Sequence, residues 1–302
     1  MYLASFLHDG NLKFGVRTKD EGAIIEAIEA EKQLFPEPFL PNTLQGVIEN
    51  PEALARLKEI SQRESEVSGK AILPFADVVL EAPIPEPKRD IICLGLNYRE
   101  HAMEYTNAME EAQNLPEYPI VFTKATTTVI GPNQKIKSHR HVTSKIDYEA
   151  ELAIVIGKEG TNISKEEAYD YIFGYTIIND VSARDLQKQH SQWFLGKSLD
   201  TFGPMGPFLV TEDEIERPVK LDVKCRVNGE VRQNSNTELL IFDIPTIIQT
   251  VSGGVTLKPG DIIATGTPKG VGLGFDPPKF LNEGDVVEVE IEKIGVLKNI
   301  VS

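Results

Sequence analysis

The stretch Asp147-Tyr148-Glu149-Ala150-Glu151 runs directly into Leu152-Ala153-Ile154-Val155-Ile156, so two carboxylates stand at the start of an apolar segment typical of a buried strand. Successive side chains of a strand point to opposite faces, which places Glu149 and Glu151 side by side on one face. Burying a carboxylate is costly unless an opposite charge offsets it. We therefore expect this segment to build both the core sheet and a charged site within it.

A third acid ends a second apolar run, Thr176-Ile177-Ile178-Asn179-Asp180. If the two strands are neighbours, Glu149, Glu151 and Asp180 converge, and their pKa values must rise steeply unless a cation holds them charged. The alternative, three unrelated surface carboxylates, is disfavoured by the apolar residues on both sides. We favour a cation. Ligation by carboxylate oxygen, without a histidine or cysteine pattern, indicates Mg²⁺ or Mn²⁺ and not zinc.

The composition is that of a soluble globular protein, with 302 residues, 41% hydrophobic and 25% charged. A formal charge of -15 argues against binding to nucleic acid or to an anionic membrane surface. Cys93 and Cys225 are too few for a disulfide framework or a cysteine zinc site. Because the chain shows no signal peptide and no membrane span, we expect a cytoplasmic location.

The N-terminal part predicts a hairpin around Asp9-Gly10, a helix capped by Asp20, and a second helix starting at Asn50-Pro51. Alternating prolines at 83, 85 and 87 then favour an extended connector. We therefore divide the chain into a small N-terminal α+β domain of residues 1–82, a proline-rich connector of residues 83–90, and a larger domain of residues 91–302.

Strands dominate the larger domain, and helices are few. Ser164, with capping-box spacing to Glu167, and Ile244-Pro245 predict helix starts, while Asn228-Gly229 predicts a two-residue hairpin turn. The strands do not alternate regularly with helices, so we expect an α+β, mainly β sandwich and not a doubly wound sheet. The clearest strands are 91–94, 120–123, 152–156, 176–178, 221–227, 261–264 and 286–291.

His101 and Glu104 lie three residues apart in a segment with helical propensity, which brings them to one helix face. A carboxylate beside an imidazole fixes its tautomer and favours its protonated form, so the pair could act as a base dyad. The alternative is an exposed histidine and glutamate on a polar helix.

Three further polar residues follow Asp180. On a helix, Arg184 and Gln187 would stack above that acid, where the guanidinium could hold a substrate carboxylate with two hydrogen bonds. The alternative for Arg184 is an ion pair with Asp185 or with the acid trio. Lys197, among apolar and small residues, suits a partly buried ammonium that binds an oxyanion or transfers a proton.

The glycine-rich segment 265–274 matches neither phosphate-binding pattern, and Asp276-Pro277-Pro278 follows where a helix would have to start. We interpret it as a loop whose backbone amides, with Thr267, approach a small anionic substrate. His139 and His141 suggest the His-x-His of cupin dioxygenases, but Glu149 lies too far downstream to complete that pattern.

The motifs that follow the connector, taken in their order along the chain, resemble those of the fumarylacetoacetate hydrolase superfamily. The resemblance covers about the last two-thirds of the chain. The resemblance implies a mixed β-roll fold, a homodimer, Mg²⁺ or Mn²⁺ on the acid trio, and a dyad carried on a mobile lid. It also implies substrate-binding roles for Arg184, Gln187, Lys197 and Thr267. The motifs are Gly95-Leu96-Asn97-Tyr98 with His101 and Glu104, Asp147 to Leu152, Asn179-Asp180 with Ala183 to Gln187, Gly196-Lys197-Ser198, Val227 to Glu230, and Gly260 to Pro268.

Members of this superfamily share 2-oxo acid substrates that form an enolate on the metal, but they differ in the reaction that follows. A single catalytic unit after a small N-terminal domain looks most like the bacterial oxaloacetate-handling members. The leading hypothesis is therefore keto-enol tautomerisation or decarboxylation of oxaloacetate, with His101, Glu104 and Lys197 as catalytic residues. The alternatives are an acylpyruvate or fumarylpyruvate C–C hydrolase, a hydroxymuconate-type isomerase or decarboxylase, and a non-catalytic metal-binding scaffold.

Overall fold

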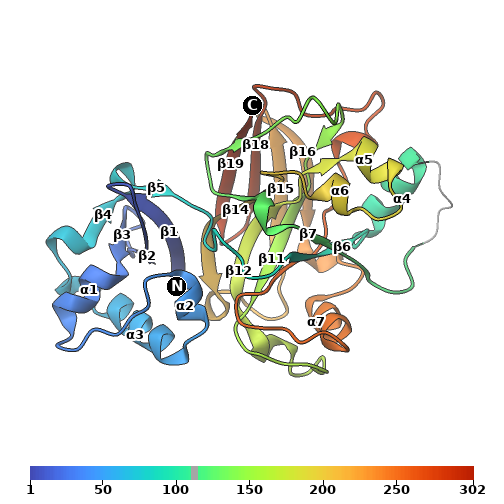
Figure 1. Ribbon diagram of the computed structural model, residues 1–302. Coiled ribbons are helices and arrows are strands. Elements are labelled where there is room, and N and C mark those ends of the chain that lie inside the picture. Colours follow the sequence, from blue (N-terminus) through green and yellow to red (C-terminus); the bar gives the residue numbers. More distant parts are fainter. Residues whose placement is uncertain (110–114) are drawn as a thin grey trace.

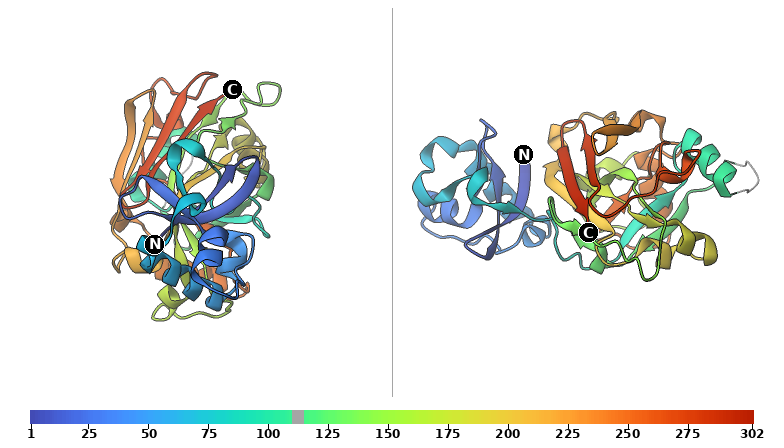
Figure 2. Two further views of the ribbon diagram at one scale, coloured as in Figure 1. Left: turned by 90° about the vertical axis from the view of Figure 1, so that its left-hand side faces the viewer. Right: turned by 90° about the horizontal axis from the view of Figure 1, so that it is seen from above.

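The computed structural model describes residues 1–109 and 115–302. Figure 1 shows a smaller lobe formed by the N-terminal residues beside a larger, strand-rich lobe, and Figure 2 shows the same division from two other sides. In the described part of the chain, no helix combines the length and apolar character needed to cross a membrane.

The largest sheet runs through both lobes, and in the described residues it contains twelve strands. Its central pairing is antiparallel, between β11 and β12, so the two apolar runs with acidic residues at their ends are direct neighbours. Strand β5 (Val79–Leu80) pairs with β1, and β8 (Val129–Ile130) pairs with β14. The remaining order is β4 (Ile72–Pro74), β3 (Ala23–Glu26), β2 (Asn11–Arg17), β1 (Tyr2–His8), β14 (Gly203–Thr211), β12 (Ile172–Asn179), β11 (Ala150–Ile156), β17 (Ile262–Ala264), β6 (Ile91–Gly95) and β7 (Ile120–Lys124).

A second sheet packs against the first, and a short ladder joins a segment just before Glu149 to a segment just after Asp180. The ladder pairs β10 (Ile146–Asp147) with β13 (Ser182–Ala183). The five strands of the second sheet are β16 (Glu230–Asn236), β15 (Asp222–Val227), β18 (Val286–Ile291), β19 (Gly295–Val301) and β9 (Lys135–Ile136). The fold is thus α+β and mainly β, as predicted.

Strand β11 is buried on both faces, which explains its unbroken apolar sequence. Leu152, Ile154 and Ile156 face the core between the two sheets. Ala153 and Val155 face a second core, on the side of the large sheet covered by the N-terminal helices. Glu149 and Glu151 share the parity of this second set, so the sheet itself sets the direction of the acid pair.

The N-terminal lobe contains the predicted hairpin, with His8 opposite Asn11 across the turn. Asn50 caps α3 (Pro51–Gln62) as expected, because its side chain accepts hydrogen bonds from the first helical amides. The predicted cap at Asp20 is wrong: Asp20 closes a turn by accepting from Gly22, and a strand follows. Helix α1 (Ala27–Leu34) starts later, and α2 (Leu44–Ile48) lies between α1 and α3.

In the larger lobe, α7 (Ile244–Ser252) and the Asn228-Gly229 hairpin turn are where the sequence predicts them. Ser164 and Glu167 form their capping hydrogen bonds, but a short 3-10 turn at Ala168–Tyr171 follows instead of an α-helix. Residues 83–90 form neither helix nor strand. The division of the chain into domains there stays a prediction. The other helices are α4 (Arg99–Met109), α5 (Arg184–Gln189) and α6 (Phe194–Lys197).

Candidate active site

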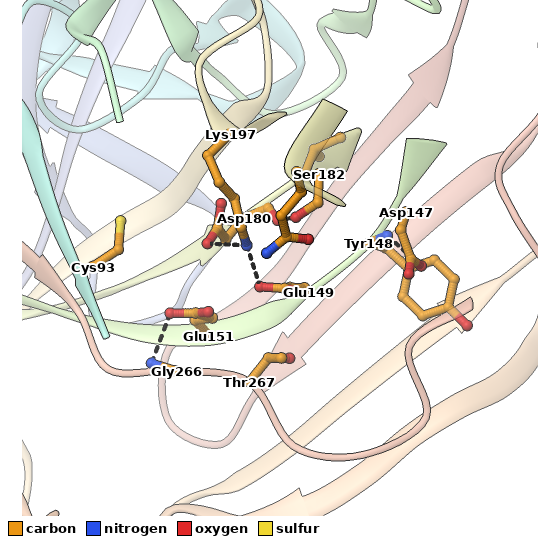
Figure 3. Close-up of polar contacts among 12 residues, drawn as sticks. Cys93, Asp147, Tyr148, Glu149, Glu151, Asp180, Ser182, Lys197, Gly266 and Thr267 are labelled. Atoms are coloured by element: carbon orange, nitrogen blue, oxygen red, sulfur yellow. Dashed lines mark hydrogen bonds and ion pairs between the residues drawn. The ribbon is translucent and has the colours of Figure 1, made fainter. Parts of the chain in front are cut away.

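The three acids converge at one end of the β11–β12 pair. Glu151 lies opposite Ile178 in the register, and Asp180 follows two residues later on the same face, where its amide donates to the Glu149 carbonyl at 2.9 Å. All three side chains are buried, and one oxygen of each lies within 4.8 Å of the others. Figure 3 shows the trio with Lys197 above it.

Two lysines neutralise much of this charge. Lys197 Nζ lies 2.8 Å from Glu149 Oε2 and 2.7 Å from Asp180 Oδ2 (Figure 3). Lys124, fully buried at the end of β7, lies 2.7 Å from Asp180 Oδ1 and also donates to the Val181 and Lys197 carbonyls. Burial alone would lower the pKa of Lys197, but Asp180 and Glu149 outweigh burial and raise it. Sequence reasoning missed Lys124, and the available signal was a lysine ending an apolar run.

Arg184 extends the charged cluster toward α5. Its Nε lies 2.8 Å from Asp147 Oδ2 and its Nη1 2.7 Å from Glu149 Oε1, so of the alternatives the ion pair with the trio forms. Nη1 also donates to Gln187 Oε1 at 3.0 Å. Nη2 is buried and has no hydrogen-bond partner among the described residues. Burial opposes the charge, but Asp147 and Glu149 raise the pKa of Arg184.

The helical stacking that placed Arg184 above Asp180 is wrong. Helix α5 begins at Arg184, and strand β13 separates it from Asp180. The β10–β13 ladder instead brings Arg184 to Asp147 and Glu149, because Ile146 pairs with Ala183 and the Arg184 amide donates to the Lys145 carbonyl at 3.0 Å. A chain reversal, and not a helix face, therefore directs the guanidinium toward Glu149.

Glu151 is the member of the trio that lacks a positive partner. It accepts a hydrogen bond from the Gly266 amide at 2.7 Å, and it forms no ion pair within residues 1–109 and 115–302. Burial, followed by Asp180 and Glu149, raises its pKa well above the usual range. Glu149 behaves in the opposite way: burial would raise its pKa, but Lys197, Arg184 and His101 lower it.

This donor set fits a divalent cation. The cluster holds four buried carboxylates, including Asp147, against three buried cations, which leaves one negative charge uncompensated beside Glu151. Carboxylate oxygens are the ligands that Mg²⁺ and Mn²⁺ take in proteins. Glu149, Glu151 and Asp180 form the single group of three or more metal-binding side chains found in the described part of the chain. His139 and His141 belong to no such group.

His101 and Glu104 meet on α4 as the spacing predicts, with 3.3 Å between His101 Nδ1 and Glu104 Oε2. His101 is 3% exposed, so the alternative of an exposed polar pair does not hold for it. Both oxygens of Glu104 also accept from the Gly270 amide, at 3.0 and 3.1 Å. The dyad is thereby tied to the glycine-rich loop.

The loop amides serve the protein's own carboxylates. Besides Gly270, the Gly266 amide donates to Glu151, and the amides of Gly272 and Leu273 donate to Asp147. The expectation that these amides approach an anionic substrate is therefore wrong for these four residues.

Thr267 lies beside the acids (Figure 3), but its hydroxyl is engaged within the protein. Oγ1 donates to the Ala150 carbonyl at 3.0 Å and accepts from Gln233 Nε2 at 2.8 Å.

A single pocket collects most of these residues. It contains about 250 Å³ of empty space, part of it open to solvent. Glu104 and Asp180 are not in its wall, but they contact His101 and Lys197, which are. One side of the pocket is aromatic, and Trp193 lies against both Tyr105 and Phe122. The wall is formed by Leu94, Gly95, Leu96, His101, Tyr105, Phe122, Glu149, Glu151, Arg184, Gln187, Trp193, Lys197 and Thr267.

Comparison with known proteins agrees with this geometry. Residues 90–302 match the family model described as fumarylacetoacetate (FAA) hydrolase C-terminal, and the chain belongs to the fumarylacetoacetate hydrolase family. Oxaloacetate tautomerase YisK of Bacillus subtilis (strain 168) is 49% identical over 284 residues, which cover 93% of each chain.

Two solved structures extend the comparison over the whole chain. A fumarylacetoacetate hydrolase from psychrophilic Exiguobacterium antarcticum is 41% identical, with a TM-score of 0.80 and coverage of 100% of this chain and 99% of the other. Maleylpyruvate hydrolase from Sphingobium sp. SYK-6, in complex with manganese (II) ion and pyruvate, is 31% identical, with a TM-score of 0.76 and coverage of 100% and 98%. The protein is thus an enzyme of this family, one solved member of which is in complex with manganese (II) ion.

Proposed function

We propose that this protein is a Mg²⁺- or Mn²⁺-dependent enzyme that interconverts the keto and enol forms of oxaloacetate and promotes its decarboxylation. The observation that carries the proposal is the convergence of a buried acid trio with a spare negative charge and a histidine–carboxylate pair on one pocket. The similarity to an oxaloacetate tautomerase, at 49% identity, supports the choice of substrate.

Glu149, Glu151 and Asp180 would hold the cation. When bound there, a divalent cation supplies Lewis acidity that polarises a 2-oxo group and stabilises the enolate derived from it. Lys124 and Lys197 hold Glu149 and Asp180 in place through their ion pairs. Arg184 directs its unpartnered Nη2 toward an anionic group of the substrate.

His101 is proposed to move the proton. Its Nδ1 faces Glu104, which leaves Nε2 as the ring nitrogen for the substrate. In ketonisation the enol loses the proton on its C2 oxygen and gains one at C3, and a histidine held by a carboxylate can mediate both transfers in turn. In decarboxylation the bond from C3 to the distal carboxylate breaks, CO₂ leaves, and C3 receives the proton afterwards.

A C–C hydrolase is the second candidate, and the same dyad supports it. His101 could take a proton from water that attacks an acyl carbonyl, and one solved relative at 31% identity is a maleylpyruvate hydrolase. The hydrolase consumes a water molecule, whereas tautomerisation and decarboxylation of oxaloacetate do not. Acetylpyruvate and fumarylpyruvate are therefore the substrates that separate them.

The test follows the ultraviolet absorbance of enol-oxaloacetate and, in a coupled assay, the release of pyruvate, with Mn²⁺ present. We expect enol decay to accelerate and acylpyruvates to remain intact. Cleavage of acetylpyruvate without any effect on oxaloacetate would transfer the assignment to the hydrolase. Acceleration of neither reaction, together with a melting temperature unchanged by Mn²⁺, would favour the non-catalytic scaffold.

A further inference from the structure

A second cavity lies behind Arg184, between α4 and α5, which are neighbours in Figure 1. It contains about 640 Å³ of empty space, part of it open to solvent, and its wall includes Arg184, Lys145 and Lys188. Arg184 also lines the active-site pocket, so this one residue borders both spaces. The two cavities are therefore adjacent through the side chain of Arg184.

Arg184 has one donor that the protein does not use. Nε and Nη1 are held by Asp147, Glu149 and Gln187, whereas Nη2 is buried without a hydrogen-bond partner in the described residues. Leaving a buried charged donor unsatisfied is costly, and an anion would remove that cost. The whole side chain is 2% exposed, so its position is fixed by these contacts and not by solvent.

The two lysines are placed beside Arg184 by its own backbone. The Lys145 carbonyl accepts from the Arg184 amide at 3.0 Å, and Lys188 follows Arg184 by one helical turn on α5. Both side chains are exposed, and neither forms an ion pair within the described parts of the chain.

Among the described residues that line this cavity, Asp185 is the carboxylate, and both of its oxygens already accept hydrogen bonds. Its Oδ1 accepts from Thr143 Oγ1 at 2.6 Å and its Oδ2 from the Ser144 amide at 3.1 Å. Burial would raise its pKa, but these hydrogen bonds lower it, so Asp185 stays charged. Arg184 is already paired with Asp147 and Glu149, so among the described lining residues Lys145 and Lys188 against Asp185 leave one positive charge, which attracts anions.

We propose that Lys145 and Lys188, with Nη2 of Arg184, form an outer anion-binding compartment of the active site that selects 2-oxo acids carrying a second carboxylate. This inference rests on the proposed function, and it adds the residues that distinguish a dicarboxylate from a monocarboxylate. The cation that the acid trio would hold engages the 2-oxo end of the substrate, and the outer compartment attracts the distal carboxylate, which meets Nη2 of Arg184.

Trp193, the single tryptophan of the chain, lines the active-site pocket and provides a fluorescence signal for binding. The Mn²⁺-loaded protein is titrated with two probes. Oxalate has no distal carboxylate beyond its two adjoining carboxyl groups, and 3,3-difluorooxaloacetate has one but cannot enolise because it lacks hydrogen at C3. The variant is Lys145→Gln with Lys188→Gln, and the control is Lys165→Gln with Lys135→Gln, which removes equal charge from exposed positions outside both cavities.

We expect the Lys145/Lys188 double variant to bind difluorooxaloacetate about fivefold to tenfold more weakly, with oxalate affinity unchanged within about twofold. The loss should shrink at high salt, because exposed charges are screened. Equal weakening of both probes, or a loss no larger than in the control, overturns the proposal.

Turnover of enol-oxaloacetate by the wild type is measured separately. Absence of turnover with selective loss of difluorooxaloacetate binding would reject the proposed reaction and keep the compartment. Turnover without selective loss of difluorooxaloacetate binding would support the proposed reaction and reject the outer compartment.

Discussion

Both carboxylate oxygens of Glu104 accept a hydrogen bond from the Gly270 amide, at 3.0 and 3.1 Å, and Oε2 also lies 3.3 Å from His101 Nδ1. The same carboxylate therefore orients the imidazole and fastens α4 to the glycine-rich loop. Asp147 binds that loop from the other side through the Gly272 and Leu273 amides. The loop is thus a common support for the dyad and for Arg184, which Asp147 also holds.

The first prediction concerns the charge of this carboxylate. Glu104→Gln keeps an acceptor for Gly270 but cannot stabilise an imidazolium at His101, so we expect kcat for enol-oxaloacetate to fall by roughly a hundredfold. The melting temperature should change little. Glu100→Gln is the control, because it removes an exposed carboxylate from the same helix. Equal activity of the two variants would exclude His101 and Glu104 as the proton-handling pair.

A second prediction uses Gly274, whose added Cβ would lie 2.1 Å from Glu104 Oε1. Gly274→Ala must displace that flexible side chain, so we expect kcat to fall while the fold persists. Gly254→Ala serves as the matched control, because nothing lies within 4 Å of its Cβ position. The kcat of both variants is measured, and circular dichroism checks that both are folded. Full activity of Gly274→Ala would contradict the prediction.

The third prediction contrasts two members of the trio in metal-free protein. Asp180→Asn deprives Lys124 and Lys197 of a buried partner, and breaking such pairs costs about 3–5 kcal/mol of unfolding free energy. Glu151→Gln removes a buried charge without an ion-pair partner in the described residues, so metal-free stability should hold or rise. Urea unfolding measures both changes.

Both substitutions should also abolish the stabilisation of the wild type by Mn²⁺. Retained stabilisation of Glu151→Gln in a Mn²⁺ titration of the melting temperature would place the cation elsewhere. Asp200→Asn is the control, because that aspartate is exposed and outside the trio.

A fourth prediction concerns pH and the junction between the lobes. Burial raises the pKa of Glu81 above its ordinary value of 4.5, although Gln134 donates a hydrogen bond to it. A raised folded-state pKa gives stability that is present below the unfolded value and is lost as pH rises through the folded value. Glu81→Gln should therefore gain stability relative to the wild type between about pH 4 and pH 7. Urea midpoints measure this, with Glu86→Gln as an exposed control, and a constant difference across the range contradicts it.

The acid trio could be predicted because it depends on local rules. Strand alternation aligns Glu149 with Glu151, and the pairing of two successive apolar runs delivers Asp180. The His101–Glu104 contact follows similarly from helix spacing. Both arrangements are present in the structure, and the roles of these residues toward a substrate stay predictions.

Lys124 and the partners of Arg184 could not be predicted in the same way. Lys124 reaches Asp180 across 56 residues, and that contact depends on where β7 lies in the sheet. Asp147 belongs to the sequence motif, but the motif does not indicate that this residue joins Arg184 to the glycine-rich loop. Such contacts depend on which distant strands pair in the sheet, and local sequence patterns do not predict that pairing.

The acid trio is built into the central strands of a sheet that runs through both lobes, whereas the dyad sits on one helix held to the loop by Glu104. The two halves of the site therefore have different tolerance to change. Evolution or design can alter α4 without changing the strands that carry the acids. Exchange of this helix between relatives would therefore replace the proposed proton-handling pair and leave the acid trio in place.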